Sequence, residues 1–305
     1  MIKRTLYFGN PAYLKTNNEQ LVIEMRDLAN GEAGTGETKS APIEDIGLLI
    51  LDHQQITITQ ALLAKLLANN TAVITCDHTH HPAGMLLSLD GHSLQSQKFQ
   101  AQVEATVPLK KQLWQQTVMA KIKNQAALLQ IQQEENKVLL TYAAEVKSGD
   151  SENNEAKAAA YYWKRIFPET LEFRRERYGP PPNNLLNYGY AILRAMVARS
   201  LVASGLLPTL GIHHRNQYNA YCLADDIMEP YRPYVDWIVC RIIRGNGKFL
   251  EMTPSMKKEF LSMPAMDVII DEQKSPMMNA IQRTTASLAK CFENKSRKIL
   301  YPDLK

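Results

Sequence analysis

The spacing of apolar and polar residues changes near residue 90, and this change divides the chain into two regions. In the first region, apolar residues either alternate with polar ones or form short runs, which is typical of β-strands. Asn17 and Asn18 separate two of these runs and tolerate the positive φ of a tight hairpin turn. The polar stretch 29–40 is expected to form a mobile loop tip. The pattern predicts one helix at 59–70 and strands at 5–8, 13–16, 20–25, 46–52, 71–77 and 84–89.

From about residue 101, apolar residues recur near helical spacing, as Leu109, Leu113 and Trp114 do in the stretch 107–132. The tail 293–305 is basic and is expected to fray. The predicted helices are 107–132, 134–147, 153–167, 184–204, 217–244 and 277–292, the fifth bent or divided by Pro230 and Pro233.

These patterns predict an α+β fold made of two domains. A small, mainly β domain covers residues 1–90, and a larger, all-helical domain covers residues 101–305. The segment 91–100 is polar, contains Gly91 and has no sustained periodicity, so we expect it to be a linker. The candidate chemistry described below lies in the helical domain, which is therefore expected to be catalytic.

Membrane and disulfide-rich classes do not suit this composition. No apolar segment approaches the roughly 20 residues needed to cross a bilayer, and the N-terminus has no apolar run of signal-peptide length. We therefore expect a cytoplasmic protein without a membrane partner. The cysteines are far apart and form no CxxC pair, which favours reduced thiols over disulfides or a zinc site. They are Cys76, Cys222, Cys240 and Cys291.

The net charge of +4 is unevenly distributed. Residues 1–100 carry 7 Lys+Arg and 10 Asp+Glu, net −3, whereas residues 101–305 carry 28 and 21, net +7. A positive surface around a small acidic site suits a metal enzyme that acts on a polyanion such as nucleic acid. A solvated surface with a slight lysine excess explains the charge equally well.

The segment 211–233, GIHHRNQYNAYCLADDIMEPYRP, places two histidines close to three carboxylates. Asp225 and Glu229 share a helix face beside Asp226, and such like charges repel unless a cation holds them together. Oxygen donors with a single imidazole suit Mg²⁺ or Mn²⁺ better than structural zinc, and these ions support phosphodiester chemistry. The alternative is a solvated acidic turn with the histidines at a helix start.

Glu155 is a second carboxylate in an unusual position. In a helix that starts near residue 153, Ala158, Tyr162 and Ile166 share its face, and no cation of the same helix does. A buried carboxylate must find a cation, a donor or a proton. Alternatively, Glu155 lies in the first turn, where the helix dipole favours an acid that stays hydrated.

Basic residues interleaved with aromatics at 173–190 indicate a nucleic-acid contact, although an ordinary charged helix end explains them equally well. A proline turn precedes a helix that we expect to be capped near Asn183 or Asn184. The expected DNA contacts are Arg174, Arg175, Arg177, Asn184, Arg194, Arg215, Arg241, Arg244 and Lys248.

The run from Cys76 to His81 is a rival metal site, because it holds a thiol and three imidazoles within six residues. It follows a predicted strand and precedes Pro82. A hairpin loop with exposed imidazoles is therefore the favoured interpretation.

Four segments together closely resemble CRISPR-associated endonuclease one, the spacer-acquisition integrase, and most of all the branch found in type II systems. The resemblance covers nearly the whole chain in the same order, and its histidine-pair motif is highly specific. It implies that the β domain mediates homodimerisation and that the helical domain holds the catalytic metal. The segments are YFGNPAYLKTNNEQLVIE (7–24), NNEAKAAAYYW (153–163), NNLLNYGYAILRA (183–195) and LGIHHRNQYNAYCLADDIMEPYRP (210–233).

The resemblance also implies three catalytic metal ligands. Glu155 matches the glutamate of a Glu-Gly-x-x-Ala run, and Glu229 matches the acid of an Asp-x-x-Glu-Pro segment. His214 best matches the histidine ligand, with His213 as its neighbour, and either imidazole can fill the role at this stage. Asp226 is a close additional acid.

The sequence departs from the family pattern at two places. Ala156 replaces a frequent glycine, and Pro181-Pro182 replace an Asp-Pro pair that often precedes the asparagine, which leaves the phosphate contacts near Asn184 open. Neither change removes a ligand. Asp225 is expected to face water.

In the implied reaction, the ligands hold Mg²⁺ or Mn²⁺ while the 3′-hydroxyl of a captured DNA fragment attacks a CRISPR repeat strand. The resemblance further implies two homodimers bridged by a dimer of CRISPR-associated protein two, with arginines binding double-stranded DNA largely through its backbone. Two alternatives stay open: a standalone metal-dependent nuclease and a non-catalytic DNA-binding scaffold.

Overall fold

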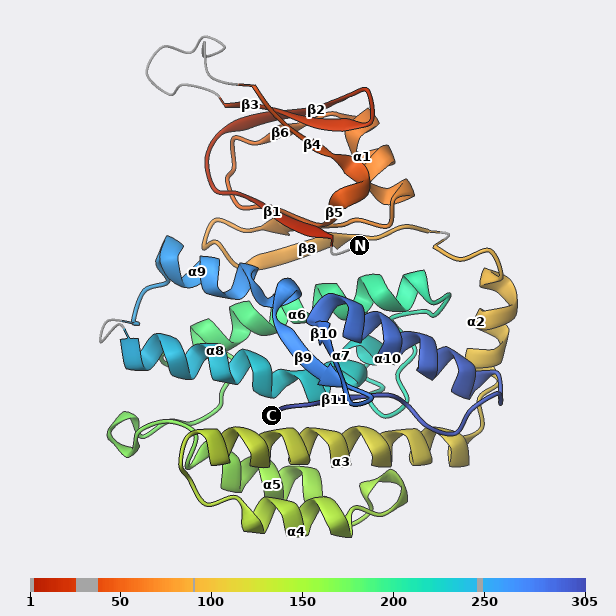
Figure 1. Cartoon of the computed structure of the whole chain (residues 1–305), viewed down its shortest axis with the longest axis vertical. Helices are drawn as coiled ribbons and strands as arrows, with labels where there is room; N and C mark the ends of the chain where they lie inside the picture. Colours follow the sequence, from red (N-terminus) through yellow and green to blue (C-terminus); the bar gives the residue numbers. More distant parts are fainter. Residues whose placement is uncertain (1–2, 26–37, 90, 246–248) are drawn as a thin grey trace. The chain divides into compact units, whose positions relative to one another are not determined.

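The computed structural model describes residues 3–25, 38–89, 91–245 and 249–305. The chain divides into two compact units, Met1–Ser93 and Leu94–Lys305 (Figure 1). The expected linker at 91–100 is instead helical from Gln95 onward, because α2 covers Gln95–Val103. Most of the loop expected at 29–40 lies outside the described residues.

The first unit contains two four-stranded sheets. In the order β1-β5-β7-β8, the first three strands are parallel and β8 is antiparallel to β7. Parallel neighbours need a crossover, and α1 (Gln60–Ala68) provides one between β5 and β7. The first sheet contains β1 (Arg4–Phe8), β5 (Ile46–Leu51), β7 (Ala72–Cys76) and β8 (Pro82–Leu86). The second, in spatial order, contains β4 (Lys39–Pro42), β3 (Gln20–Met25), β2 (Ala12–Asn17) and β6 (Thr57–Ile58).

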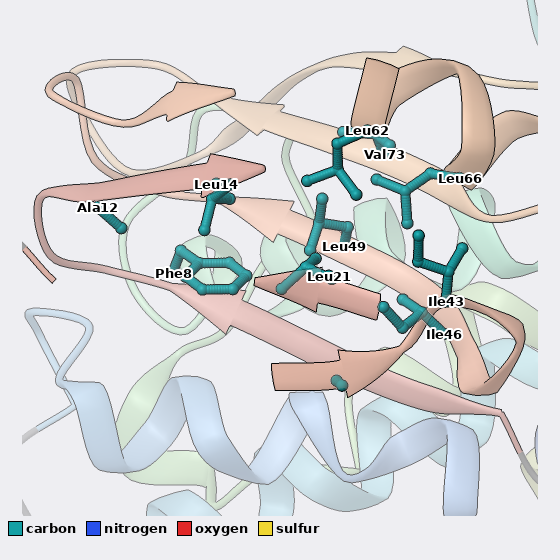
Figure 2. Packing of buried hydrophobic residues seen from close by; sticks show 11 residues of the cluster. Phe8, Ala12, Leu14, Leu21, Ile43, Ile46, Leu49, Leu62, Leu66 and Val73 are labelled. Atoms are coloured by element: carbon teal, nitrogen blue, oxygen red, sulfur yellow. The ribbon is translucent and has the colours of Figure 1, made fainter. Parts of the chain in front are cut away.

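Apolar side chains from both sheets and α1 form the core of this unit. Figure 2 shows Leu14 and Leu21 of the second sheet, Leu49 of the first sheet and Leu62 of the helix within one buried cluster. The β2–β3 hairpin turns through Asn18 and Glu19, which both have positive φ. The predicted hairpin is confirmed, with its left-handed pair one residue later than the two asparagines.

The second unit is mainly helical, as its periodicity predicts. In Figure 1, α4 and α5 lie along α3, and the contacts between these helices agree. The predicted helix at 217–244 is divided at Pro230, because α7 ends at Met228 and α8 begins at Arg232, whereas Pro233 lies in the first turn of α8. Besides α2, the α-helices of this unit are α3 (Val107–Ile131), α4 (Lys137–Glu145), α5 (Asn154–Trp163), α6 (Asn183–Ala203), α7 (Cys222–Met228), α8 (Arg232–Gly245), α9 (Pro254–Leu261) and α10 (Met277–Phe292).

Short 3-10 turns lie between several of these elements, one turn in the first unit and the others in the second. One of them, η4, separates α7 from α8 and carries a candidate site residue. The turns are η1 (Ile43–Asp45), η2 (Ser148–Asp150), η3 (Glu169–Leu171), η4 (Glu229–Tyr231) and η5 (Met263–Ala265).

The C-terminal tail packs against the second unit, so the expectation that it frays is wrong. Its strand β11 pairs with β9 in a small sheet, which also corrects the all-helical expectation. Buried Asn124 on α3 donates to the carbonyls of Pro302 (2.9 Å) and Pro230 (2.7 Å) and accepts from the Leu304 N–H. A buried amide needs such partners, and these ones fix both the tail and η4 against α3. The sheet, in the order β10-β9-β11, contains β9 (Asp267–Ile270), β10 (Gln273–Pro276) and β11 (Pro302–Asp303).

All four cysteines are free thiols, and three of them are buried. No helix in the described ranges is both long enough and apolar enough to cross a membrane.

Candidate metal-binding and catalytic site

The two glutamates that the sequence singles out meet at one lysine. Glu155, in the first turn of α5, lies with its Oε1 2.7 Å from Nζ of Lys121 on α3. Glu229, in η4, lies with its Oε2 2.6 Å from the same nitrogen. The cation that Glu155 lacked on its own helix therefore comes from α3, and the fold joins two acids that are far apart in sequence.

Glu229 is buried, yet it remains ionised. Burial alone would raise the pKa of its carboxyl group, but Arg232 and Lys121 outweigh that effect and lower the pKa to about 2. Arg232 Nε donates to Glu229 Oε1 at 2.7 Å. The contact from Lys121 to Oε2 lacks the alignment of a hydrogen bond, so this buried oxygen has no hydrogen-bond partner within the described ranges.

Asp226 organises the loop that carries the two histidines. Its Oδ2 accepts the backbone N–H groups of Ile212 (2.7 Å) and His213 (2.9 Å), and its Oδ1 accepts that of His214 (3.2 Å). A Cβ at Gly211 would lie 2.4 Å from the His214 carbonyl oxygen, so only glycine fits this turn. Asp226 is fully buried and its oxygens are occupied, which makes it a positioning residue for the histidine loop.

The two imidazoles have different surroundings. His213 stacks on Trp114 at 4.1 Å with an interplanar angle of 3°, and burial lowers its pKa. The Nδ1 of His214 lies 2.5 Å from Asp226 Oδ1, and this hydrogen bond raises the pKa of His214. When Nδ1–H is directed at a carboxylate, Nε2 presents its lone pair outward, which is the usual arrangement of a metal-binding histidine.

The expectation that Asp225 faces water is wrong. It is buried, and its oxygens lie 2.6 Å and 3.2 Å from Arg194 Nε and Nη2. Asn219 donates to the same carboxylate at 2.7 Å. The neighbouring acids Asp225 and Asp226 therefore point to separate partners, which removes the repulsion that their spacing suggested.

The donor chemistry of this site fits a hard divalent cation. Two carboxylates, Glu155 and Glu229, already share one positive group, and a histidine with a free ring nitrogen is close enough for both to raise its pKa. In the conformation described, however, no three His, Cys, Asp or Glu side chains converge on one point among the described residues. The Lys121 ammonium takes the place between the two carboxylates.

A second buried acid, Asp236 on α8, lies near the site but has neutral partners. It accepts hydrogen bonds from the hydroxyls of Tyr162 (2.8 Å) and Tyr190 (2.5 Å). Burial raises the pKa of Asp236 to about 6, although these hydrogen bonds oppose the rise. The guanidinium of Arg232 lies 4.5 Å from the centre of the Tyr190 ring, so the two buried acids are connected through that arginine.

Sequence reasoning missed three residues of this region. Arg232 lies one turn after Glu229, a spacing that could have identified it as the counter-ion. Asp236 follows two helical turns after Glu229, but nothing local reveals its tyrosine partners. Lys121 gives no local signal, because its partners come from other elements.

Several expected DNA contacts are engaged within the protein. Arg175 donates to the side-chain oxygens of Asn183 (2.9 Å) and Asn187 (2.8 Å), and Arg194 pairs with Asp225. Arg241 lies 3.3 Å from Glu259 on the surface. The remaining candidates Arg174, Arg177, Arg215 and Arg244 have exposed side chains, whereas Lys248 lies outside the described residues.

The expected asparagine cap of α6 is absent. The N-cap is Pro182, which makes no side-chain hydrogen bond, and α6 begins at Asn183. Asn183 instead binds the preceding segment, donating to the carbonyls of Arg174 and Pro180. Asn184 donates to the Leu250 carbonyl at 3.3 Å.

The histidine tract of the first unit forms the predicted hairpin loop, between β7 and β8. His78 and His80 are exposed, but His80 Nδ1 lies 2.8 Å from Asp52 Oδ1 and His81 Nδ1 lies 3.1 Å from the Thr79 carbonyl oxygen, so two imidazoles have partners. These residues do not converge as a metal site in the part of the chain that the structure describes.

Comparisons with known proteins agree across the chain. The model of the family "CRISPR associated protein Cas1" matches residues 6–251. The chain is 35% identical over 302 residues to a CRISPR-associated endonuclease Cas1 from Neisseria meningitidis, covering 98% of this chain and 95% of the relative. Two solved structures share the fold at 20% identity each. They are a casposase bound to integration product (TM-score 0.78; 98% of this chain, 92% of the other) and a Cas6-RT-Cas1–Cas2 complex (TM-score 0.74; 100% and 36%).

Proposed function

The chain belongs to the CRISPR-associated Cas1 family, and from this premise we propose that it is a metal-dependent DNA integrase that inserts captured fragments into a CRISPR repeat array. The observation that carries the proposal is the convergence of Glu155 and Glu229 on one cation beside His214. The name of the Neisseria relative, an endonuclease, and the integration product bound by the casposase support the same chemistry. The extent of the Neisseria match makes the type II branch the expected one.

Glu155, Glu229 and the Nε2 atom of His214 are the proposed ligands of a Mg²⁺ or Mn²⁺ ion. Bound there, such an ion supplies positive charge to the scissile phosphate as negative charge develops on it. His214 is preferred over His213 because its Nδ1 is fixed on Asp226, whereas the ring of His213 is stacked flat on Trp114.

The other residues of the site position these ligands. Arg232 keeps Glu229 ionised and fixes one of its oxygens, and Asp226 fixes the loop and ring of His214. In the proposed reaction, the 3′-hydroxyl oxygen of the fragment bonds to a repeat phosphorus as the existing phosphorus–oxygen bond to the neighbouring nucleotide breaks. The attacking hydroxyl loses its proton, and the leaving 3′-oxygen gains one.

The proposed assembly contains double-stranded DNA and further protein chains. The first unit, expected at residues 1–90, mediates a homodimer, and a dimer of CRISPR-associated protein two bridges two such dimers. The Cas1–Cas2 complex among the structural relatives supports this partner. The exposed arginines Arg174, Arg177, Arg215 and Arg244 are the proposed backbone contacts.

An integration assay tests the function. The purified chain is mixed with its partner protein, a labelled duplex with 3′-hydroxyl ends, a plasmid carrying the repeat, and Mn²⁺. We expect joined product, loss of that product in Glu155→Gln and Glu229→Gln, and DNA binding that is largely unchanged in both. Glu145→Gln, at an exposed position of α4, is the matched control and should join as the wild type does.

Two other outcomes would redirect the assignment. Cutting without joining indicates the standalone nuclease, and DNA binding that is the same in chelator, with no product in Mn²⁺, indicates the scaffold. Full strand transfer by either glutamine variant contradicts the assigned site.

A further inference from the structure

Lys121 has no part in the mechanism above, although its ammonium lies between the two glutamates assigned to the metal. Nζ lies 2.7 Å from Glu155 Oε1 and 2.6 Å from Glu229 Oε2, and only 12% of the lysine side chain is exposed. Burial would lower its pKa, but the two glutamates outweigh that effect and raise it. The group is therefore a largely buried cation held between two carboxylates.

The fold needs a cation between these two carboxylates, and in the absence of a metal ion the protein itself must supply it. Glu155 and Glu229 are like charges in a largely water-excluded region, and such a pair is costly without compensation. Arg232 compensates Glu229 through Oε1, on the other side of that carboxylate. Lys121 alone among the described cations bridges Glu155 and Glu229.

A divalent ion held by the same two carboxylates competes with the ammonium directly. The ammonium occupies the space between Glu155 Oε1 and Glu229 Oε2, and the positive charges of the ion and the ammonium would repel each other at short range. Metal binding therefore requires Lys121 to withdraw. A lysine suits this because its ammonium is a compact charge on a flexible four-carbon stem.

We propose that Lys121 is an internal placeholder for the metal ion: its ammonium keeps Glu155 and Glu229 together in the metal-free protein and is displaced when the ion binds. The inference rests on the proposed function, because it concerns the same site. It assigns Lys121 as a positioning residue that maintains the geometry of the empty site and lowers its affinity for the ion.

Mn²⁺ affinity, measured by calorimetry on the full chain without DNA, tests the proposal. Removing the competing ammonium in Lys121→Met should tighten Mn²⁺ binding by about tenfold or more. In the wild type, part of the binding free energy is spent on breaking the ion pairs of Lys121 with the two glutamates, and the variant has no such ion pairs to break. Lys123→Met, two residues along the same helix at an exposed position, should bind Mn²⁺ as the wild type does. Equal or weaker binding by a folded Lys121→Met protein overturns the proposal.

A second measurement covers the case in which Lys121→Met does not fold. Acetic anhydride labels accessible amines, and mass spectrometry of one peptide that contains both lysines gives Lys121 labelling relative to Lys123. In the wild type, saturating Mn²⁺ should increase the relative labelling of Lys121 several-fold over chelator. Unchanged labelling at Mn²⁺ saturation overturns the displacement.

The two proposals fail in different ways. If Glu229→Gln binds Mn²⁺ as tightly as the wild type, the ion is not held at this site, and the metal assignment fails together with the placeholder. If Glu229→Gln loses Mn²⁺ while Lys121→Met and the wild type bind it equally, the proposed function stands and only the placeholder is rejected.

Discussion

Two buried acids of the second unit, Glu229 and Asp236, lie seven residues apart, and their pKa values are moved in opposite directions. Glu229 faces Arg232 and Lys121, which lower its pKa to about 2 in spite of burial. Asp236 is hydrogen-bonded to two tyrosine hydroxyls, and burial raises its pKa to about 6. The fold thus surrounds the Glu229 carboxylate with cations, whereas the Asp236 carboxylate accepts hydrogen bonds from neutral hydroxyl groups.

This difference separates a candidate metal ligand, Glu229, from an acid that stabilises the fold, Asp236. A carboxylate that is ionised at all ordinary pH values, with one oxygen left without a hydrogen bond, is suited to bind a cation. A carboxylate whose oxygens are occupied by hydroxyl donors is suited to fix helices: Asp236 joins α8 to α5 and α6 through Tyr162 and Tyr190. Burial alone does not reveal which role an acid has, whereas its partners do.

The largest expected effect concerns strand transfer. Glu229→Gln should reduce the single-turnover joining rate by about 10²–10³-fold or more, because it removes a proposed ligand of the ion that would stabilise the developing charge. Asp236→Asn should reduce it by no more than about tenfold, since Asp236 reaches Glu229 only through Tyr190 and Arg232. Equal losses in the two variants would erase the distinction between the acids.

The next effect concerns stability. Arg232→Met should lower the free energy of unfolding by about 3 kcal/mol, because it leaves the buried Glu229 short of one counter-ion. Urea denaturation at pH 7.5 measures this change. Arg244→Met, at an exposed position of α8, is the matched control and should lie within about 0.5 kcal/mol of the wild type.

The two acids should also respond to pH with opposite sign. The raised pKa of Asp236 means that the folded state loses stability as pH rises from about 4 through about 6, and Asp236→Asn removes this loss. The lowered pKa of Glu229 contributes stability above about pH 4.5 that is lost as pH falls toward 2, and Glu229→Gln removes this contribution. Each of these pKa changes corresponds to about 3 kcal/mol.

Urea denaturation curves of the wild type and both variants, recorded from pH 3 to pH 7, measure these differences. The stability of Asp236→Asn relative to the wild type should increase as pH rises, whereas that of Glu229→Gln should decrease. Parallel curves for the two variants would show that the partners do not set the charge states as described.

The smallest expected effect concerns the hydrogen bonds that Asp236 accepts. Tyr162→Phe removes one of the two hydroxyl donors to Asp236 and should lower the free energy of unfolding by about 1 kcal/mol. The change should leave Mn²⁺ binding unaltered, because Tyr162 contacts no proposed ligand through its hydroxyl. Thermal unfolding with and without Mn²⁺ measures both.

The sequence predicts the helices and strands well where periodicity is strong, as in 107–132 and 277–292. The resemblance proposes Glu155, His214 and Glu229 as ligands, and the fold brings the two glutamates to one cation. It could not predict Lys121, because the bridge joins α3, α5 and η4, and such proximity arises only in the folded chain. The tail was expected to fray because its basic residues suggest solvation. Its order comes from contacts with residues remote in sequence: β11 pairs with β9, and the buried amide of Asn124 binds Pro302 and Leu304.

The most direct test of the central claim is the Mn²⁺ content of the free protein, measured by electron paramagnetic resonance titration of the wild type, Glu229→Gln and Asp236→Asn. The account predicts that the wild type and Asp236→Asn bind one ion per chain with similar affinity, and that Glu229→Gln binds it at least about tenfold more weakly, a loss of about 1.4 kcal/mol. Binding by Glu229→Gln that matches the wild type, or an equal loss in Asp236→Asn, would contradict it.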